Sequence, residues 1–326
     1  MPTPTFRASA AALLACLLAL TFPAFAGAKK GSAAADLRVV DPGGRTLADL
    51  TQLTGPARIR TDPRADCFGP GTGGSGDAVT VGGSTALGQL AHAGATDLQV
   101  RRLGITDAFD FGLGICRIGP AVAPSTGYWY LKVNHEASFT GADLTTVRRG
   151  DEVLWYLIED FNDPVPDELA LQAPAVVEPG DPFAVEVTSY DDDGDASPAA
   201  GVTVTGAAAP TDAQGRAMVT VSSRTRVLRA TRTGSITSNA VTVCTKAAGD
   251  CPAGYARTIG GTPRTDRIVG SRAAEKIESG AGRDRIDARR GAARDRIDCG
   301  RGKDRLILAR RSDSHHRSCE RVKRRR

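Results

Sequence analysis

The sequence predicts a mainly β, multidomain protein. The chain of 326 residues has room for two or three domains of ordinary size. Its 37 glycines and 18 prolines, with only 5% aromatic residues, suit many short strands joined by turns rather than long helices. Short alternating apolar runs recur up to about residue 245, and a period of nine follows from residue 260.

Residues 1–28 have the layout of a secretory signal. Arg7 precedes an apolar run over residues 10–20, and Ala24-Phe25-Ala26 offers small residues for cleavage. The run is short for a membrane span, and no later stretch is long and apolar enough to anchor the protein. We therefore expect a secreted or cell-envelope-associated chain without a transmembrane anchor.

Six cysteines remain once the signal, with Cys16, is removed. An even number in an exported chain predicts disulfides. Six cysteines permit fifteen pairings, and neighbourhood along the chain favours Cys67–Cys116, Cys244–Cys251 and Cys299–Cys319. A structural zinc site is disfavoured because no pair has the C-x-x-C spacing.

The first segment, residues 36–171, predicts strands around one helix. DLRVVDPGGRTL indicates a strand, a Pro-Gly-Gly turn and a second strand. Ser84 is the expected N-cap of a short helix that Gly94 ends. Residues 127–135 and 151–158 alternate as strands. These elements define an α+β domain.

Three residues of the strand 127–135 are candidate ligand-binding residues: Trp129, Tyr130 and Asn134. Aromatic rings can line a ligand surface, but aromatic residues that alternate along strands are more often core. Both interpretations stay open at this point.

The motifs GGSTALGQLAHAG, GYWYLKVNH and GADLTTVRRGDEVLWYLIED, taken in order, give the first segment a family resemblance. It resembles a secreted bacterial domain of unknown function related to the C-terminal domain of transcobalamin. The resemblance implies a grasp-like fold in which a sheet holds a helix. In transcobalamin the related domain covers a corrinoid, but the larger helical domain that completes that site has no counterpart in this sequence, so the resemblance does not by itself imply a corrinoid ligand.

The second segment, residues 174–245, predicts a small β-sandwich from five short runs: 182–190, 199–206, 216–223, 226–232 and 238–244. The pieces GVTVTGAAAPTDAQGRAMVTV and LRATRTGSITSNAVTV resemble a bacterial Ig-like domain, which implies a spacer or adhesive module. The turn YDDDGD, residues 190–195, is either a calcium loop or a solvated turn. Residues 246–259 are an expected linker with a small disulfide loop.

The third segment, residues 260–320, has a regular repeat. Aliphatic residues stand at spacings of 9, 9, 11 and 9, and each has an acid two places earlier. The aliphatic residues are Ile268, Ile277, Ile286, Ile297 and Leu306. The acids, which are our candidate calcium ligands, are Asp266, Glu275, Asp284, Asp295 and Asp304.

This spacing matches the frame G-G-x-G-x-D-x-U-x, and the stretch resembles a degenerate haemolysin-type (RTX) calcium-binding repeat. The resemblance implies a short, degenerate parallel β-roll with calcium as cofactor, held by carboxylates and by carbonyls of glycine turns. Two glycines remain in each of the Asp284 and Asp304 frames, and one in each other frame. The alternative is that each acid caps a turn or pairs with a neighbouring arginine.

The C-terminal end is strongly basic. Residues 260–326 hold 21 Lys and Arg against 10 Asp and Glu, whereas the whole chain has a net charge of +5. The basic tail, residues 321–326, is either a solvated, disordered end or a contact with an anionic surface such as an envelope polymer. Specific nucleic-acid binding is not expected, because aromatic residues for base stacking are missing there.

Catalytic motifs are missing from the sequence. VNHEAS does not extend to H-E-x-x-H, and no G-x-S-x-G occurs. The sequence thus favours a secreted, non-enzymatic modular protein for binding or adhesion, with calcium in its repeats and an unknown ligand or envelope polymer as partner. The alternative hypothesis is a calcium-dependent exported enzyme whose active site has no recognised motif.

Overall fold

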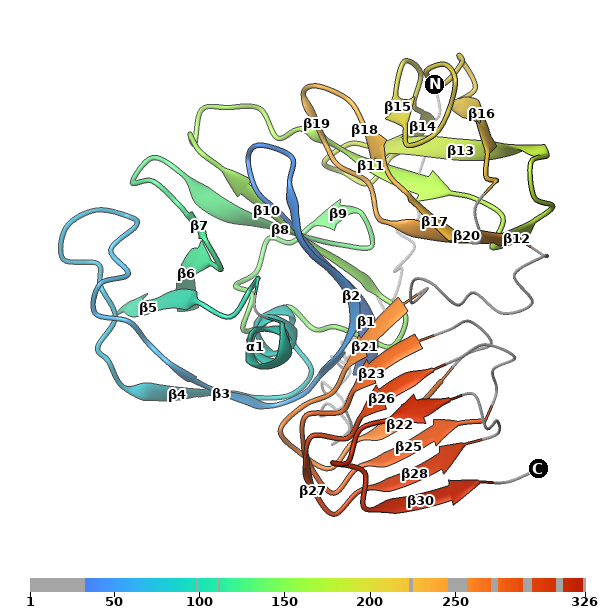
Figure 1. Ribbon diagram of the computed structural model, residues 1–326. Coiled ribbons are helices and arrows are strands. Elements are labelled where there is room, and N and C mark those ends of the chain that lie inside the picture. The colour runs from blue at the N-terminus through green and yellow to red at the C-terminus, as the bar shows by residue number, and fades with distance from the viewer. Residues whose placement is uncertain are drawn as a thin grey trace, which may run out of the picture.

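The protein is mainly β and contains several sheets (Figure 1). The computed structural model describes residues 33–324, apart from 98, 111, 223–224, 246–256, 271–274, 290–294 and 309–312. The expected signal, residue Cys251 and most of the expected linker therefore lie outside the described residues. Within the described part, no helix is long and apolar enough to cross a membrane.

A nine-stranded sheet runs through the molecule in the order β29-β26-β23-β21-β2-β1-β10-β8-β9. Its N-terminal half begins with the predicted hairpin, in which β1 (Ala33–Val40) and β2 (Thr46–Thr54) are antiparallel. The turn between them places Gly44 at a φ of 78°, a left-handed conformation that glycine adopts without strain. The half is completed by β10 (Glu152–Ile158), β8 (Tyr128–Val133) and β9 (Glu136–Ala137).

The helix α1 (Ala86–Thr96) packs against this half of the sheet. Its N-cap is Thr85, whose hydroxyl accepts a hydrogen bond from the N–H of Gly88. The predicted cap was Ser84, one residue earlier. Gly94 does not end the helix, which continues to Thr96. A side chain at Gly94 would approach the Val100 carbonyl at 3.2 Å, so the glycine permits close packing rather than termination.

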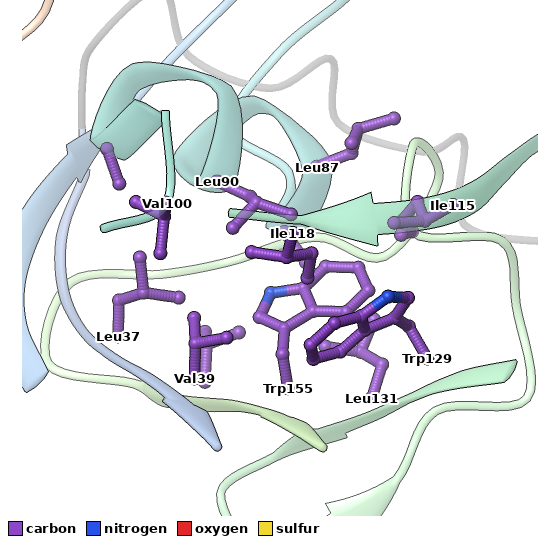
Figure 2. Packing of buried hydrophobic residues seen from close by; sticks show 14 of the residues in the cluster. Leu37, Val39, Leu87, Leu90, Val100, Ile115, Ile118, Trp129, Leu131 and Trp155 are labelled. Atoms are coloured by element: carbon purple, nitrogen blue, oxygen red, sulfur yellow. The ribbon is translucent and has the colours of Figure 1, made fainter. Parts of the chain in front are cut away.

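The core of this first unit lies between helix and sheet (Figure 2). Trp129 and Leu131 of β8 and Trp155 of β10 point toward Leu87 and Leu90 of α1. All five side chains are buried, with Trp129 only 7% exposed. The core interpretation of the alternating aromatic residues is therefore confirmed for the two tryptophans.

Smaller sheets extend the first unit. They consist of β3 (Ala57–Arg60), β4 (Ala78–Val81), β5 (Leu103–Phe109), β6 (Gly112–Ile118) and β7 (Ala121–Val122). The predicted disulfide Cys67–Cys116 joins the loop after β3 to β6, with the Cα atoms 5.2 Å apart.

The second unit has its own hydrophobic core, which reaches from Leu169 to Val243. Its strands are β11 (Asp167–Gln172), β12 (Val176–Val177), β13 (Pro182–Tyr190), β14 (Ala196–Pro198), β15 (Thr203–Val204), β16 (Arg216–Thr220), β17 (Thr225–Leu228), β18 (Ala230–Thr231), β19 (Ser235–Ile236) and β20 (Val241–Thr245). They form sheets in the orders β14-β13-β11-β19, with β16 beside β13, then β12-β20-β17 and β15-β18.

One predicted boundary is wrong. β11 was assigned to the first segment, residues 36–171, but it pairs with β13 over five residues. The alternating residues Leu169 and Leu171 are buried in the second core. Alternation shows that a strand exists, but it does not show which sheet receives the strand.

The C-terminal residues 257–324 form two parallel stacks of short strands, which we call the ladder (Figure 1). One stack continues the nine-stranded sheet with β21 (Arg257–Gly260), β23 (Glu275–Glu278), β26 (Arg296–Asp298) and β29 (Ser314–His315). The other contains β22 (Arg267–Val269), β25 (Arg285–Ala288), β28 (Arg305–Leu308) and β30 (Arg321–Arg324). A third, shorter pair is β24 (Ala281–Gly282) with β27 (Arg301–Gly302).

At both ends of the repeat region, the structure differs from what the sequence predicts. The expected linker, residues 246–259, already includes the first strand of the ladder from residue 257. The basic tail is not a dangling end, since Arg321–Arg324 pair in parallel with β28. Lys and Arg on an edge strand discourage another chain from pairing with it. The predicted disulfide Cys299–Cys319 joins neighbouring coils of the ladder.

Gln52 of β2 holds the ladder against the first unit. Its side-chain amide is fully buried and donates to the carbonyls of Gly260, Gly261 and Leu53. A side chain at Gly260 would lie 2.2 Å from Gln52 Oε1, so the glycine is needed for this approach. β2 and β21 are parallel at this point.

Gln52→Leu is expected to lower the free energy of unfolding by about 1–3 kcal/mol, because buried carbonyls lose their donor. Chemical denaturation followed by circular dichroism measures the change. Gln214→Leu is the matched control, since Gln214 is exposed in a turn. Equal losses in both variants would show that the amide does not join the two parts.

Candidate cation site

The period of nine places acids on the inside of the ladder. Residues at alternate positions of a strand share a face, so Asp284 lies on the same side as Ile286, two residues later. Both are buried, and the same holds for Asp304 with Leu306. The core of the ladder therefore contains a column of carboxylates beside its column of aliphatic side chains.

One acid column passes through Asp266, Asp284, Asp304 and Glu320. The backbone N–H of each of the three aspartates donates to the carboxylate of the acid in the next coil. The distances are 2.9 Å from Asp266 N to Asp284 Oδ1, 2.8 Å from Asp284 N to Asp304 Oδ1 and 2.9 Å from Asp304 N to Glu320 Oε2. This column brings together three of the five predicted ligands.

The other two predicted ligands lie in a second acid column. Glu275 N donates to Asp295 Oδ1 at 3.0 Å, and Asp295 N donates to Asp313 Oδ1 at 3.4 Å. The turns before these acids, with Gly291, lie outside the described residues. The five predicted residues are thus divided between two separate columns.

The first acid column borders a stack of glycine turns. Gly282 and Gly302 have φ angles of 131° and 150°, and they lie in register in neighbouring coils. A side chain at Gly302 would lie 1.5 Å from the Gly282 carbonyl oxygen and 3.2 Å from Asp304 Oδ1. The glycine therefore lets the Gly282 carbonyl approach closely, and this carbonyl oxygen and Asp304 Oδ1 both lie near Gly302.

The carboxylates of this column differ in how fully they are hydrogen-bonded. Both oxygens of Asp266 accept hydrogen bonds from Thr262, through its N–H and its hydroxyl. Oδ2 of Asp284 and Oδ2 of Asp304 have no hydrogen-bond partner, although both residues are at least 98% buried. A buried carboxylate oxygen without a hydrogen-bond partner lowers the stability of the fold. At these two oxygens, therefore, the hydrogen bonding of the column is incomplete.

Burial raises the pKa of these acids. It raises the pKa of Asp266 to about 6, although hydrogen bonds from Thr262 act against it. It also raises the pKa of Asp284 to about 6 and that of Asp295 to about 7. For Asp304 the direction is the same and the main cause is again burial. Within the described part of the chain, none of these four carboxylates forms an ion pair.

In the first acid column, the arginine that follows each aspartate does not neutralise the charge of that aspartate. Arg267, Arg285 and Arg305 are exposed on the outer face, because alternation directs them away from the acids. Within the described residues, the structure shows no ion pair between these arginines and the acid column. Of the two non-metal interpretations, turn capping fits Asp266, and pairing with arginine fits none of the three.

Side chains alone do not complete a metal site here. Among the described residues, no three His, Cys, Asp or Glu side chains are grouped closely enough to hold a metal ion. A cation at Asp284 and Asp304 would need carbonyl oxygens and water as further ligands. Calcium accepts such mixed oxygen ligands.

The other sequence candidates have structural partners. Trp129 is core, and the Tyr130 hydroxyl donates to Asp192. Asn134 accepts a hydrogen bond from Glu152 N and donates one to Asp151.

The YDDDGD turn packs on the first unit, where the Asp191 carbonyl accepts a hydrogen bond from the Lys132 ammonium. Asp191 Oδ1 accepts from the N–H groups of Asp193 and Asp195, as in a turn.

Sequence reasoning missed a buried ionic cluster between the first and second units. Arg38 forms a short ion pair with Glu168 and also donates to the Leu169 and Thr237 carbonyls. His135 Nδ1 lies 3.1 Å from Glu168 Oε1. Burial raises the pKa of Glu168, but Arg38, His135 and Lys132 outweigh it and lower that pKa below its usual value. A cavity of about 240 Å³ lies beside the cluster.

Asp313 and Glu320 were also missed as members of the acid columns. Asp313 stands nine residues after Asp304, so the repeat period contains the signal. The aliphatic residue that should follow two places later is replaced by His315. Glu320 breaks the period, and only the stacking of coils brings it beneath Asp304.

Comparison of the chain with protein-family profiles, with curated proteins and with solved structures finds no match. The function therefore has to be argued from the geometry of the chain itself.

Without divalent cations, the free energy of unfolding is expected to fall as the pH rises from about 4 to about 7. Asp266, Asp284 and Asp295 have raised pKa values in the folded chain, so it binds more protons than the unfolded chain in this range. Urea denaturation at several pH values in EGTA measures the slope. In Asp284→Asn the slope should be smaller, and an unchanged slope would contradict the assignment to Asp284.

Arg38→Met is expected to cost about 3–5 kcal/mol of stability, because it leaves Glu168 buried without its main partner. Arg45→Met is the matched control. The Arg45 side chain is 62% exposed in its pair with Asp41, so its loss should cost no more than about 1 kcal/mol. Thermal and urea unfolding of both variants provide the comparison. Similar small effects in both would show that the buried pair does not hold the units together.

Proposed function

We propose that the chain is a secreted, non-enzymatic modular binding protein whose ladder binds calcium between Asp284 and Asp304. The observation that carries the proposal is the pair of buried, unpartnered oxygens, Asp284 Oδ2 and Asp304 Oδ2. They belong to neighbouring coils, which Asp284 N and Asp304 Oδ1 join. A cation between the coils would give both oxygens a partner.

The residues around this position fit calcium. Calcium takes six to eight oxygen ligands, from carboxylates, carbonyls and water, in flexible geometry. Asp284 and Asp304 supply carboxylates, and the Gly282 carbonyl oxygen lies near Gly302, as Asp304 Oδ1 does. A side chain at Gly302 would prevent this close approach of the two coils. When bound, calcium would neutralise buried negative charge and link successive coils.

The finer architecture belongs to the same proposal. The parallel register of Asp266, Asp284 and Asp304 supports a degenerate β-roll of the RTX kind. The separate second core supports an Ig-like spacer, and the helix against the first sheet supports a grasp-like domain. The disulfides Cys67–Cys116 and Cys299–Cys319 support secretion, because disulfides persist mainly in oxidising compartments.

Calcium is expected to stabilise the full chain against heat, since a ligand that binds only the folded state adds about 2.7 kcal/mol at about a hundredfold excess over Kd. Differential scanning calorimetry with EGTA, magnesium or calcium measures the shift in Tm. Asp304→Asn should lose most of the calcium response. Magnesium should act more weakly, because it requires a stricter octahedral geometry.

Asp266→Asn is the matched control. It makes the same chemical change in the same column, but at a carboxylate that Thr262 already satisfies. This variant should keep the calcium response. An unchanged Tm of the natural chain in calcium, or an equal loss of response in both variants, would overturn the proposal.

A further inference from the structure

The outer face of the stack β22-β25-β28-β30 carries one arginine on every strand. Arg267 is in register with Arg285, Arg285 with Arg305, and Arg305 with Arg321. Neighbouring strands are spaced by about 4.8 Å. The four arginines therefore form a straight column with one positive charge for each strand (Figure 1 shows the four strands side by side). We call this column the arginine column.

The arginine column is exposed and uncompensated. All four side chains are exposed, and none of them forms an ion pair with a described residue. Two further exposed cations, Arg283 and Lys303, stand two residues before Arg285 and Arg305, in the turns that lead into β25 and β28. Among the described residues, two acids lie near the column. Asp287 pairs with Arg289 at 2.6 Å. Asp36 lines the same pocket as Arg267, and its carboxylate accepts a hydrogen bond from the Thr51 hydroxyl.

The other stack of the same ladder shows that such a column is not a necessary result of the basic composition. Its outer face mixes charges: Lys276 pairs with Glu278 at 2.7 Å, and His316 lies 3.7 Å from Asp298. Like charges directly opposite each other on neighbouring strands destabilise a sheet. On the mixed face, the like-charged neighbours Lys276 and Arg296 have Glu278 and Asp298 beside them on the same strands. The arginine column instead repeats four positive charges over strands that carry one acid, Asp287. Such a surplus of one sign of charge is typical of a functional surface.

We propose that the arginine column binds a linear acidic polysaccharide with one carboxylate on each sugar ring, a polyuronate. A guanidinium group binds a carboxylate through two parallel hydrogen bonds. A polymer with one carboxylate on each ring can place successive carboxylates along successive strands. Because the contacts are linked, several weak contacts add up to stable binding.

Two other anionic partners fit the surface less well. Nucleic acids gain affinity from bases stacked on aromatic rings, and the described residues of this face include the exposed Val269 but no aromatic ring. An anionic bilayer has mobile charges without a fixed repeat, so it does not require arginines in register. The regular column matches a polymer of regular repeat.

This inference specifies the envelope-polymer partner of the proposed function, but it does not depend on calcium. Asp284 and Asp304 point into the ladder, whereas Arg285 and Arg305 point away from it. Polymer binding that persists without a calcium effect on Tm would overturn the calcium site alone. A calcium effect without polymer binding would overturn the polyuronate site alone.

The experiment measures binding of the full chain to immobilised polygalacturonate by biolayer interferometry, in EGTA and at low and high salt. The natural chain should bind, and salt should weaken the binding. The double variant Arg285→Gln/Arg305→Gln should bind at least about tenfold more weakly, because it loses the two central contacts. Hyaluronate, with a carboxylate on every second sugar, should bind more weakly than polygalacturonate.

The matched control is Lys276→Gln/Arg296→Gln. These residues are in register with each other on the opposite stack, and their replacement changes the net charge by the same amount. The control should bind within about twofold of the natural chain, because its column is not the one in contact. Thermal unfolding of both double variants checks that each is folded, and removal of like charges from the arginine column should not lower Tm.

Three results would overturn the polyuronate site. The natural chain does not bind the polymer at low salt. The two double variants lose affinity equally, which would indicate attraction by net charge alone. Single-stranded DNA or anionic phosphatidylserine vesicles bind more tightly than polygalacturonate with the same dependence on Arg285 and Arg305.

Discussion

The ladder depends on parallel pairing in register, in which each coil lies directly on the one before. β2 of the first unit supplies the starting edge for this stacking, because it pairs in parallel with β21. In such an arrangement a residue contacts its own counterpart in the next coil. Ile268 lies beside Ile286, and Gly282 lies beside Gly302. The same register has a different energetic effect for each kind of side chain.

Aliphatic side chains and glycines gain from this repetition. Ile277, Ile286 and Leu306 are fully buried in one continuous cluster. Stacking costs most where the repeated residue is charged. Inside the ladder, the backbone N–H groups satisfy one oxygen of Asp284 and one of Asp304, and the second oxygen of each is left without a partner. Outside, the arginine column repeats one sign of charge across four strands.

These two columns are the places where the ladder departs from what would be most stable. Both departures have the same geometric origin, and a ligand of opposite charge would relieve each of them: a cation inside and a polyanion outside. The two ligands would act on opposite faces of the same strands, since Asp284 and Arg285 are neighbours in the sequence.

The parts of the chain are joined by buried polar contacts as well as by apolar clusters, in which Leu53 packs with the ladder and Ile236 packs with Val40 and Leu154. Gln52 connects the first unit to the ladder through carbonyls of Gly260 and Gly261. Arg38 connects it to the second unit through Glu168 and two carbonyls. Such contacts tolerate little displacement, because a buried group that loses its partner is left with an uncompensated desolvation cost. They therefore set the position of each part relative to the others.

The sequence by itself determined what depends on local periodicity. The alternation around Trp129 and Trp155 identified the core strands, and the period of nine identified the acids and aliphatic residues of the ladder. Proximity along the chain identified Cys67–Cys116 and Cys299–Cys319. The tertiary structure decided what depends on partners far away in the chain: that β11 joins the second unit, that Glu168 meets Arg38, and that Asp266 is satisfied while Asp284 and Asp304 are not. The periodicity of the sequence predicts which face of a strand a side chain occupies. Only the register between strands decides what that side chain contacts.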